Sequence, residues 1–276
     1  MNIFNIKDKT AVVFGGNGFL GQQFCKTLLE FGAFVYSCDV NIEKSKQITD
    51  LQKKYPDCFY LMEIDACNKK DLQVLKDNIL KNEKSVDILV NSTTSKGEDF
   101  YSPFEEVSLD GWNIGLTGNL TIPFLTIQNF IPVMKKQRSG SIINIASHYG
   151  IVGNDQRIYV GADLQKFYVK GNQESNDQIF SHGVYNAAKG GLINFTRYLA
   201  AYYGEYNIRV NCISPGGIFK EGCENETFTQ KYSEKVPLGR RAQVDEMNGA
   251  LIFLASDASS YVTGHNLVVD GGYTIW

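Results

Sequence analysis

The segment Thr10-Ala-Val-Val-Phe14-Gly15-Gly-Asn-Gly-Phe-Leu-Gly21 carries the strongest indication of the fold. Its first five residues form an apolar, β-branched run that is typical of a buried strand. The glycine-rich turn that follows opens an amphipathic segment reaching Phe31. A strand that enters such a turn and then a helix presents backbone N–H groups and a positive helix end to a diphosphate. We therefore expect a dinucleotide-binding loop, although glycines also serve ordinary turns.

Downstream of this segment, short apolar runs alternate with helical patterns. Strand–helix–strand crossovers are right-handed and must cover the sheet, so the alternation predicts an α/β fold: a doubly wound, mostly parallel sheet of about seven strands with helices on both faces. No composition break divides residues 1–276, which we interpret as one domain. Further strands are expected at 32–38, 59–64, 86–90, 141–146, 208–213 and 266–269. Helices are expected at about 41–54, 69–82, 111–136 (bent at Pro123 and Pro132), 185–203 and 243–255.

Composition excludes several classes of function. The formal net charge is −3 and no basic run occurs, which argues against binding to nucleic acid or a membrane surface. No apolar run reaches the roughly 18 residues that span a bilayer, and no signal-peptide pattern begins the chain. The 6 cysteines form no Cys-x-x-Cys pair, so buried free thiols and a cytoplasmic location are expected. The three histidines lack metal-ligand spacing, and no metal is expected.

An acidic residue follows the second predicted strand. Asp39 lies eighteen positions after Gly21, where a carboxylate can accept both ribose hydroxyls of an adenosine and repel a 2′-phosphate. Neither the glycine loop nor the positions directly after Asp39 hold a basic residue, which favours NAD over NADP as the cofactor. Asp39 can also serve as a helix N-cap, and the two roles are compatible.

Polar or turn residues recur at the ends of the other predicted strands. Asp65, Asn91, Ser147 and Pro215 each follow an apolar run. The carboxyl ends of parallel strands meet at one edge of a doubly wound sheet, where ligands bind. Asn119 is unusual because it lies within a long apolar helix, where an unpaired amide is costly. It is interpreted either as a functional residue or as a hydrogen-bond partner of a bent helix.

The pair Tyr185-x-x-x-Lys189 would lie one turn apart on one helix face. An ammonium beside a phenol favours the phenolate and lowers the pKa of the tyrosine, which makes a general acid/base usable near neutral pH. Taken alone, such a pair is more often a solvated helix face.

Together these residues resemble the short-chain dehydrogenase/reductase family over essentially the whole chain. The resemblance rests on the Gly15–Gly21 loop, Asp39, Asp65, Asn91, Asn119, Ser147, Tyr185 with Lys189, Asn211 to Pro215-Gly216, and Val269-Asp-Gly-Gly272. It implies a hydride-transfer enzyme that uses a nicotinamide cofactor.

The resemblance also implies roles for individual residues. Tyr185 would exchange the alcohol proton, Lys189 would lower its pKa and hold the nicotinamide ribose, and Ser147 would bind the substrate oxygen. Asn119 would anchor a water that links Lys189 to solvent. The implied cofactor contacts are Gly15, Asn17, Phe19, Leu20, Gly21, Asp39, Asp65, Ala66, Asn91, Tyr185, Lys189, Pro215 and Ile218. The substrate candidates are Ser147, His148, Arg157 and Tyr185.

The sequence departs from the family pattern at three places. Phe19 stands at the usual middle glycine, giving the spacing Gly15-x-x-Gly18-x-x-Gly21 of the sugar-nucleotide-modifying branch. Asn91-Ser-Thr-Thr94 replaces Asn-Asn-Ala-Gly. Ser147 and Tyr185 are 38 positions apart (185 minus 147), against about a dozen in the family. The excess, residues 150–183, is interpreted as a substrate lid or an oligomer arm, and Arg157 within it as a partner for an anionic group or as a solvated surface residue.

The polar insertion and the glycine spacing favour a sugar, a polyol or a sugar derivative as the small-molecule substrate. A 3-oxoacyl thioester reductase remains an alternative, as does a non-catalytic NAD-binding scaffold. The family resemblance implies a homo-tetramer or homo-dimer, and Trp276 is suited either to a subunit contact or to packing on its own domain.

Overall fold

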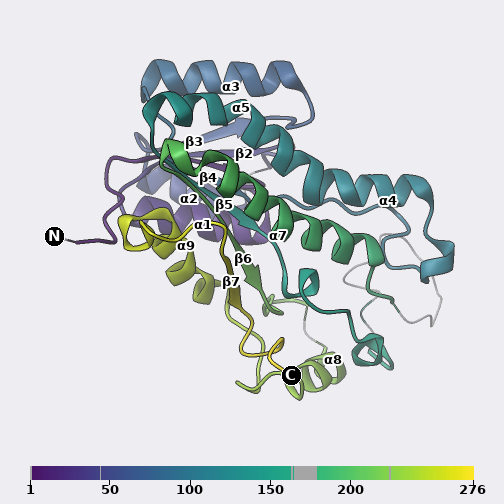
Figure 1. Cartoon of the computed structure of the whole chain (residues 1–276). Coiled ribbons are helices and arrows are strands. Elements are labelled where there is room, and N and C mark those ends of the chain that lie inside the picture. Colours follow the sequence, from purple (N-terminus) through teal and green to yellow (C-terminus); the bar gives the residue numbers. More distant parts are fainter. Residues whose placement is uncertain (1, 44, 163, 165–178, 224) are drawn as a thin grey trace.

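A single parallel sheet in the order β3-β2-β1-β4-β5-β6-β7 forms the centre of the molecule (Figure 1). The computed structural model describes residues 2–43, 45–162, 164, 179–223 and 225–276. The doubly wound α/β fold predicted from the sequence is confirmed. The strands are β1 (Thr10–Phe14), β2 (Phe34–Asp39), β3 (Phe59–Glu63), β4 (Ile88–Asn91), β5 (Gly140–Ile145), β6 (Ile208–Pro215) and β7 (Asn266–Val269).

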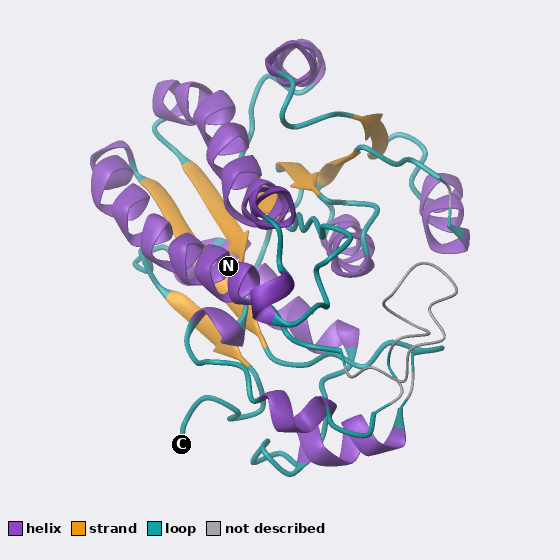
Figure 2. Ribbon diagram, turned by 90° about the vertical axis from the view of Figure 1, so that its right-hand side faces the viewer, coloured by secondary structure: helices purple, strands orange, loops and turns teal. Residues whose placement is uncertain are grey.

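Helices cover both faces of the sheet (Figures 1 and 2). One apolar core joins the sheet to α1, α2 and α9, and the other joins it to α3, α5 and α7. All five residues of β1 are buried, because a strand covered on both faces must be apolar throughout. The helices are α1 (Phe19–Glu30), α2 (Lys46–Lys54), α3 (Lys69–Asn82), α4 (Leu109–Leu116), α5 (Ile122–Gln137), α7 (Gly183–Tyr203), α8 (Glu226–Ser233) and α9 (Asn248–Ala255).

Strand register brings the predicted site residues to one edge of the sheet. Phe14, the last residue of β1, pairs with Cys38 of β2 and with Asn91 of β4. Asn91 pairs in turn with Asn144 of β5. The glycine loop, Asp39 and the residues after β4 and β5 therefore leave the sheet side by side.

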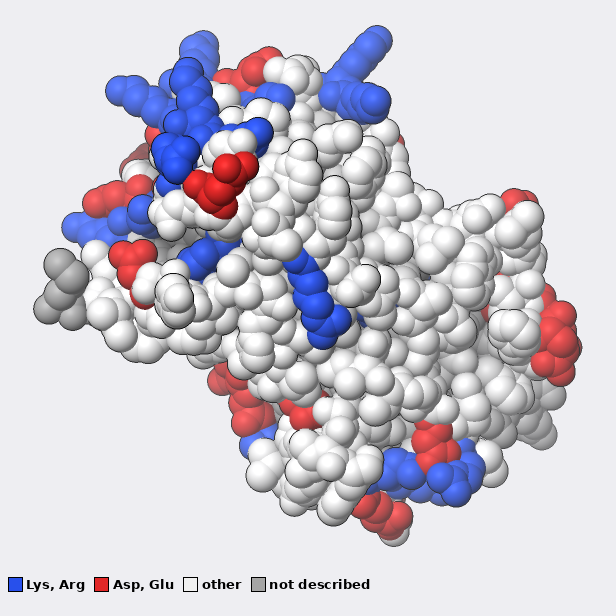
Figure 3. Space-filling view, viewed as in Figure 1, with Lys and Arg blue, Asp and Glu red and all other residues white. Residues whose placement is uncertain are grey.

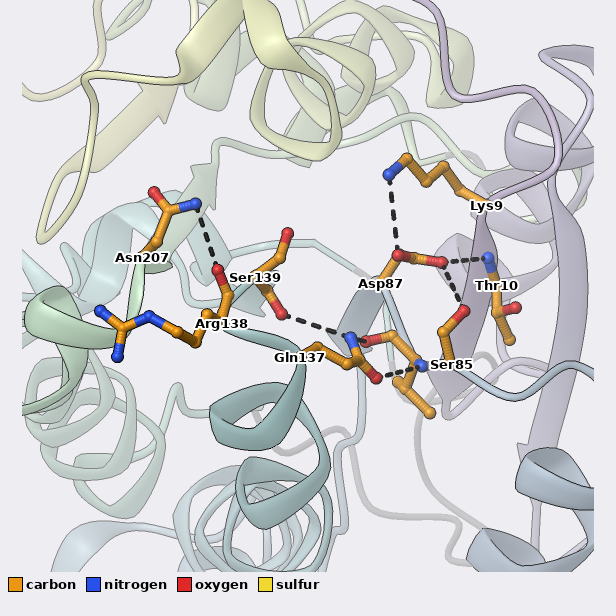
Figure 4. Close-up of polar contacts among 9 residues, drawn as sticks. Lys9, Thr10, Ser85, Asp87, Gln137, Arg138, Ser139 and Asn207 are labelled. Carbon is orange, nitrogen blue, oxygen red and sulfur yellow. Dashed lines mark hydrogen bonds and ion pairs between the residues drawn. The ribbon is translucent and has the colours of Figure 1, made fainter.

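Polar side chains fasten the opposite edge of the sheet, where the strands begin (Figure 4). Asp87 accepts hydrogen bonds from the backbone N–H of Thr10 at 2.9 Å and from Ser85 Oγ at 3.1 Å. Gln137, at the end of α5, bonds both the N–H and the carbonyl oxygen of Val86, each at 3.0 Å. These contacts fix the starts of β1 and β4 without using residues of the opposite edge.

The long helix expected over 111–136 is interrupted earlier than predicted. It consists of α4, a π-helical turn at Thr117–Thr121, and α5. Pro123 is tolerated because it lies in the first turn of α5, where its missing N–H has no intrahelical partner. Pro132 lies inside α5 without ending it. The bend predicted at the prolines was therefore placed wrongly.

Helix α2 also begins later than expected, at Lys46 rather than near 41. The hydroxyl of Ser45 accepts a hydrogen bond from Ile48 N at 3.2 Å and so caps this helix. Asp39, the N-cap considered from the sequence, therefore does not cap α2.

The described part of the insertion, residues 150–162, 164 and 179–183, packs through apolar side chains. Ile158 lies in a cluster with Tyr232, Val236 and Tyr273, and a second cluster joins Ala162, Leu164 and Ile179. Residues 163 and 165–178, which include Lys166 and Lys170, lie outside the described residues. The described part is thus less polar than the composition of the whole insertion suggests.

Two further expectations concern thiols and membranes. Cys25, Cys38 and Cys212 are buried free thiols, as predicted, whereas Cys67 is exposed. None of the helices in the described part of the chain combines the length and the apolar character needed to cross a bilayer.

Candidate active site

The glycine loop closes tightly against its neighbours. Gly15 has φ +73°, and a Cβ there would lie 2.5 Å from the carbonyl oxygen of Ser92. A Cβ on Gly21 would collide with the carbonyl oxygen of Gly15. No side chain caps the amino end of α1, whose N-cap is Gly18. Its first N–H groups are therefore suited to an anion such as a pyrophosphate. Phe19, the departure from the family spacing, is 42% exposed and does not obstruct this turn.

Asp39 lies beside the glycine loop. Its Oδ2 atom accepts a hydrogen bond from the backbone N–H of Asn17 at 3.1 Å, and Oδ1 accepts one from Asn41 N at 3.4 Å. The Asn17 side chain donates to the carbonyl oxygens of Asn41 and Glu43. Asp39 and Asn17, both predicted as cofactor contacts, are thus brought together at the end of β2.

Asp65 and Asn91, two further predicted cofactor contacts, differ in exposure and in hydrogen bonding. The exposed Asp65 uses Oδ1 to accept the Cys67 N–H at 2.8 Å, and Ala66 is buried beside it. Asn91 is only 1% exposed, and its amide lies between Thr126 Oγ1 at 2.7 Å and Asn144 Oδ1 at 2.9 Å. The side chain of Asn91 therefore fastens β4 to β5 and α5, so a ribose contact through this side chain is not supported.

A cavity of about 450 Å³ extends from the amino end of α1 to the amino end of α7. Phe19 and Leu20 line one end; Ser147, Tyr185 and Lys189 line its wall together with Pro215 and Ile218 at the end of β6. The predicted insertion contributes mainly apolar or aromatic side chains to the lining: Tyr159, Leu164, Ile179, Phe180, Ser181 and His182.

Ser147 and Tyr185 both line this cavity. Ser147 is 5% exposed and accepts the Tyr149 N–H at 3.1 Å. Burial raises the pKa of the Tyr185 phenol, and the nearby Ser147 side chain partly opposes that rise.

Lys189 lies one turn further along α7 and is 3% exposed. Its Nζ atom is 5.5 Å from the centre of the Tyr185 ring and donates to the carbonyl oxygen of Ile145 at 2.8 Å. Burial lowers the pKa of Lys189 to about 7. The ammonium is therefore only partly charged near neutral pH, and the net pKa of Tyr185 is raised. Burial is the largest cause of the raised pKa of Tyr185, and the lowering expected from Lys189 stays a prediction.

Asn119 occupies the π-helical turn and is fully buried. Its Nδ2 atom donates to the carbonyl oxygen of Gly115 at 2.9 Å. Its Oδ1 atom has no hydrogen-bond partner among the described residues. A buried orphan acceptor of this kind requires an ordered water or ligand donor, which fits the water-anchoring role implied by the resemblance.

Two substrate candidates are not brought into the cavity. Arg157 has a side chain that is 85% exposed and paired with Asp155 at 2.8 Å, so a substrate role for it is not supported. His148 is buried behind Ser147, with Nδ1 2.9 Å from the carbonyl oxygen of Pro215, and its ring packs on Tyr149 and Tyr273. Burial lowers the pKa of His148 to about 4. Neither side chain lines the cavity.

Other cavity residues were missed in the sequence. Lys96, Phe100 and Tyr101 reach it from the loop after β4, and Lys220 reaches it after β6, 5.7 Å from the centre of the Phe19 ring. His182 also lines the cavity, immediately before α7. These residues lie in loops without periodicity, so only the position of His182, one turn before Tyr185, was a signal that sequence analysis offered.

The comparisons with known proteins agree with this geometry. The family model for short chain dehydrogenases matches residues 9–162, more than half of the chain. A second model, described as enoyl-(acyl carrier protein) reductase, matches residues 173–274. The chain belongs to the short-chain dehydrogenase family. Membership of this family accounts both for the fold and for the pattern of candidate catalytic residues predicted from the sequence.

Two relatives of similar sequence identity have different activities. The D-arabinitol 2-dehydrogenase (ribulose-forming) of Candida tropicalis is 30% identical over 99% of this chain and 95% of its own. A 3-oxoacyl-(acyl-carrier-protein) reductase of Chlamydia trachomatis is 32% identical over 96% and 97%.

Two solved structures also match nearly the whole chain. A short chain dehydrogenase of Leptospira borgpetersenii with bound NAD+ is 32% identical, with a TM-score of 0.83 over 99% of this chain and 96% of that one. A gluconate 5-dehydrogenase of Burkholderia cenocepacia in complex with NADP and tartrate is 25% identical, with a TM-score of 0.82 over 100% and 98%. This short-chain dehydrogenase is accordingly an oxidoreductase that interconverts an alcohol and a carbonyl.

Proposed function

We propose that this enzyme is an NAD-dependent dehydrogenase that oxidises a secondary hydroxyl of a polyol, a sugar or a sugar derivative, and reduces the corresponding ketone. The observation that carries the proposal is that Ser147, Tyr185 and Lys189, the last 5.5 Å from the centre of the Tyr185 ring, line one cavity that reaches the glycine loop.

The chemistry follows from these side chains. A bound nicotinamide supplies the hydride acceptor. The Ser147 hydroxyl would donate a hydrogen bond to the substrate oxygen, and the Tyr185 phenolate would take the proton from that oxygen as hydride leaves the carbon that bears it. Positive charge nearby favours the phenolate, so Lys189 assists whenever it is protonated. Asn119 Oδ1 holds a water, through which the proton passes from Lys189 towards solvent.

Asp39 supports a preference for NAD over NADP. Its carboxylate stands at the end of β2 beside the glycine loop, where it would accept ribose hydroxyls and repel a 2′-phosphate. The NAD+ bound by the Leptospira structure agrees, and the NADP bound by the Burkholderia structure makes the comparison of both cofactors the direct test.

Polyol substrates are favoured by the relatives, which include D-arabinitol and glycerol dehydrogenases. A 3-oxoacyl thioester reductase is the second candidate, favoured by the apolar side chains of Leu164, Ile179 and Phe180 in the cavity and by the acyl-carrier-protein reductase relatives. The scaffold alternative is not retained, because the family and its relatives are enzymes.

The test is steady-state activity of the purified enzyme with polyols and sugar acids, and with acetoacetyl thioester in the reductive direction, each with NAD(H) and NADP(H). Turnover of a polyol with kcat/KM at least about tenfold higher for NAD supports the proposal. Thioester reduction without polyol oxidation would replace it by the second candidate, and an NADP preference would refute the role of Asp39.

We also propose that the enzyme forms a homo-dimer or homo-tetramer through α4, α5 and α7. In the orientation shared with Figure 1, the surface around α4 is a broad area with few charges (Figure 3). Exposed apolar and aromatic side chains on these helices are Leu109, Ile114, Phe124, Tyr198 and Tyr202. Exposed apolar side chains on helices in an area with few charges are typical of a subunit contact. The molar mass in solution, compared with that of Tyr198→Glu, tests this; a wild-type monomer would refute it.

A further inference from the structure

The imidazole of His182 is buried but unsatisfied. His182 immediately precedes α7, is 5% exposed and lines the cavity. Neither ring nitrogen has a hydrogen-bond partner among the residues that the structure describes. Its ring is held against Phe100, with ring centres 3.4 Å apart, and against the edge of Tyr101. A buried polar ring without partners is costly, so a ligand that satisfies it gains affinity.

A cation lies in the same part of the cavity. Lys96 donates to the Tyr101 hydroxyl at 2.6 Å and lies 5.4 Å from the centre of the Phe100 ring. Burial, and then the nearby Lys220, lower the pKa of Lys96. Burial, and then the charge of Lys96, lower the pKa of His182 to about 3. The imidazole is therefore neutral at physiological pH, with one donor and one acceptor nitrogen.

This pair is close to the reacting group. His182 and Tyr185 are three residues apart, at the start of α7, and Phe100 lies between their rings. The Phe100 ring packs edge-on against Tyr185 with centres 6.5 Å apart. A molecule with its reacting carbon at Tyr185 can therefore extend along Phe100 towards His182 and Lys96.

We infer that His182 and Lys96 form a recognition site for a second hydroxyl group of the substrate, on the carbon chain beyond the reacting hydroxyl. The inference rests on the proposed oxidation of polyols and names the residues that distinguish them from simple alcohols. A hydroxyl both donates and accepts, so it can donate to the acceptor nitrogen of a neutral imidazole while it accepts from Lys96. A carboxylate would leave the acceptor nitrogen unsatisfied.

The experiment compares wild type with His182→Phe, which keeps an aromatic ring against Phe100 but removes both nitrogens. Substrates are a polyol series (glycerol, ribitol, D-arabinitol and D-mannitol) and cyclopentanol, a secondary alcohol with a single hydroxyl. We expect kcat/KM for the best polyol to fall about 10- to 100-fold, because sites built to bind a hydroxyl discriminate strongly. We expect kcat/KM for cyclopentanol to change less than about threefold. Lys96→Met should show the same pattern, and His182→Asn should restore part of the polyol activity.

Equal losses on polyol and cyclopentanol would show that His182 only shapes the cavity, and unchanged polyol activity would show that it contacts no hydroxyl; both overturn the inference. Binding provides a readout that does not need turnover. In the wild-type complex with NADH, addition of the polyol should shift the imidazole ¹⁵N resonances assigned by comparison with His182→Phe. If no polyol is turned over, the proposed function fails while this shift still supports the recognition site; its absence overturns the inference.

Discussion

Lys189 Nζ donates a 2.8 Å hydrogen bond to the carbonyl oxygen of Ile145, the last residue of β5. The bond positions the amine beneath Tyr185 but does not replace the water that a full ammonium requires. Burial consequently lowers the pKa of Lys189 to about 7, from an ordinary value near 10.5. The buried amine of Lys189 therefore lowers the free energy of unfolding of the enzyme.

Lys189→Met should therefore abolish turnover and raise the melting temperature. Below pH 7 the lysine is charged in both folded and unfolded states, and the folded state bears the full penalty of desolvation. As the pH rises from 7 to about 10.4, the penalty disappears because the unfolded state also loses its proton. The melting temperature of Lys189→Met should exceed that of the wild type by about 3 °C or more at pH 6 and by almost nothing at pH 10. Scanning calorimetry at both values tests this, and a lower melting temperature at pH 6 would contradict it.

Tyr185→Phe should reduce kcat by about 10² to 10⁴-fold, because the phenol is the proposed proton acceptor. The dissociation constant for NADH, measured by fluorescence titration, should change less than about twofold, because loss of a catalytic proton acceptor lowers kcat without weakening ground-state binding. Since burial raises the pKa of Tyr185, wild-type oxidation should increase with pH from 6 to 9. Retained turnover in the variant would assign the proton transfer elsewhere.

Asp39→Ser should shift the coenzyme preference. Loss of the carboxylate removes both its acceptors for ribose hydroxyls and its repulsion of a 2′-phosphate, so the NADP-to-NAD ratio of kcat/KM should increase at least about tenfold. Glu63→Ser, which removes an exposed carboxylate at the end of the neighbouring β3, is the charge-matched control. Equal ratios in the two variants would refute a specific role for Asp39.

Gly21→Ala should weaken cofactor binding and lower stability, although alanine is normally the better helix former by about 0.5–1 kcal/mol. The reason is the collision between the new Cβ and the carbonyl oxygen of Gly15. Gly249→Ala in α9, where nothing lies within 4 Å of a Cβ, should instead be neutral or slightly stabilising. Melting temperatures with and without NAD test this contrast; stabilisation by both changes would be the contrary outcome.

Acid should destabilise the protein through its buried histidines. Burial lowers the pKa of His148 to about 4 and that of His182 to about 3, whereas the unfolded chain binds these protons near pH 6.5. Stability should therefore fall as the pH decreases from 6.5 towards 4. His182→Phe should reduce that fall by about 2 kcal/mol, and an unchanged fall in this variant would contradict the prediction. Urea unfolding at pH 7 and 4.5 measures the difference.

The fold and the positions of the catalytic residues were predictable because strand periodicity and strand-end residues are local signals that parallel topology brings together. For Asn91, the sequence predicted its place at the end of a strand but not the contacts of its side chain. Its burial between Thr126 and Asn144 depends on the packing of β4, β5 and α5. The net pKa of Tyr185 was not predictable for a similar reason. Spacing places Lys189 near it, whereas the degree of burial, which determines both pKa values, is a tertiary property.

Loop residues were the least predictable. The charge of Arg157 made it a candidate for binding an anionic substrate group. Its guanidinium instead pairs with Asp155, two residues earlier, and composition alone does not reveal that ion pair. His182 and Lys96, by contrast, meet only because the loop after β4 folds back over the start of α7. Their juxtaposition is a property of the tertiary structure and leaves no periodic pattern in the sequence.

The π-helical turn at Thr117–Thr121 also has a consequence for how the chain tolerates insertions and deletions. A π turn contains one residue more than an α-helix would need. Removing a single residue there would leave a turn of α-helical length, so α4 and α5 would join as one continuous helix in nearly the same rotational phase. Gly115, which faces Val184 so closely that a Cβ would lie 2.7 Å from it, would keep that contact. A one-codon deletion in this segment would thus remove the local turn that positions Asn119 while it preserves the helix surface on either side.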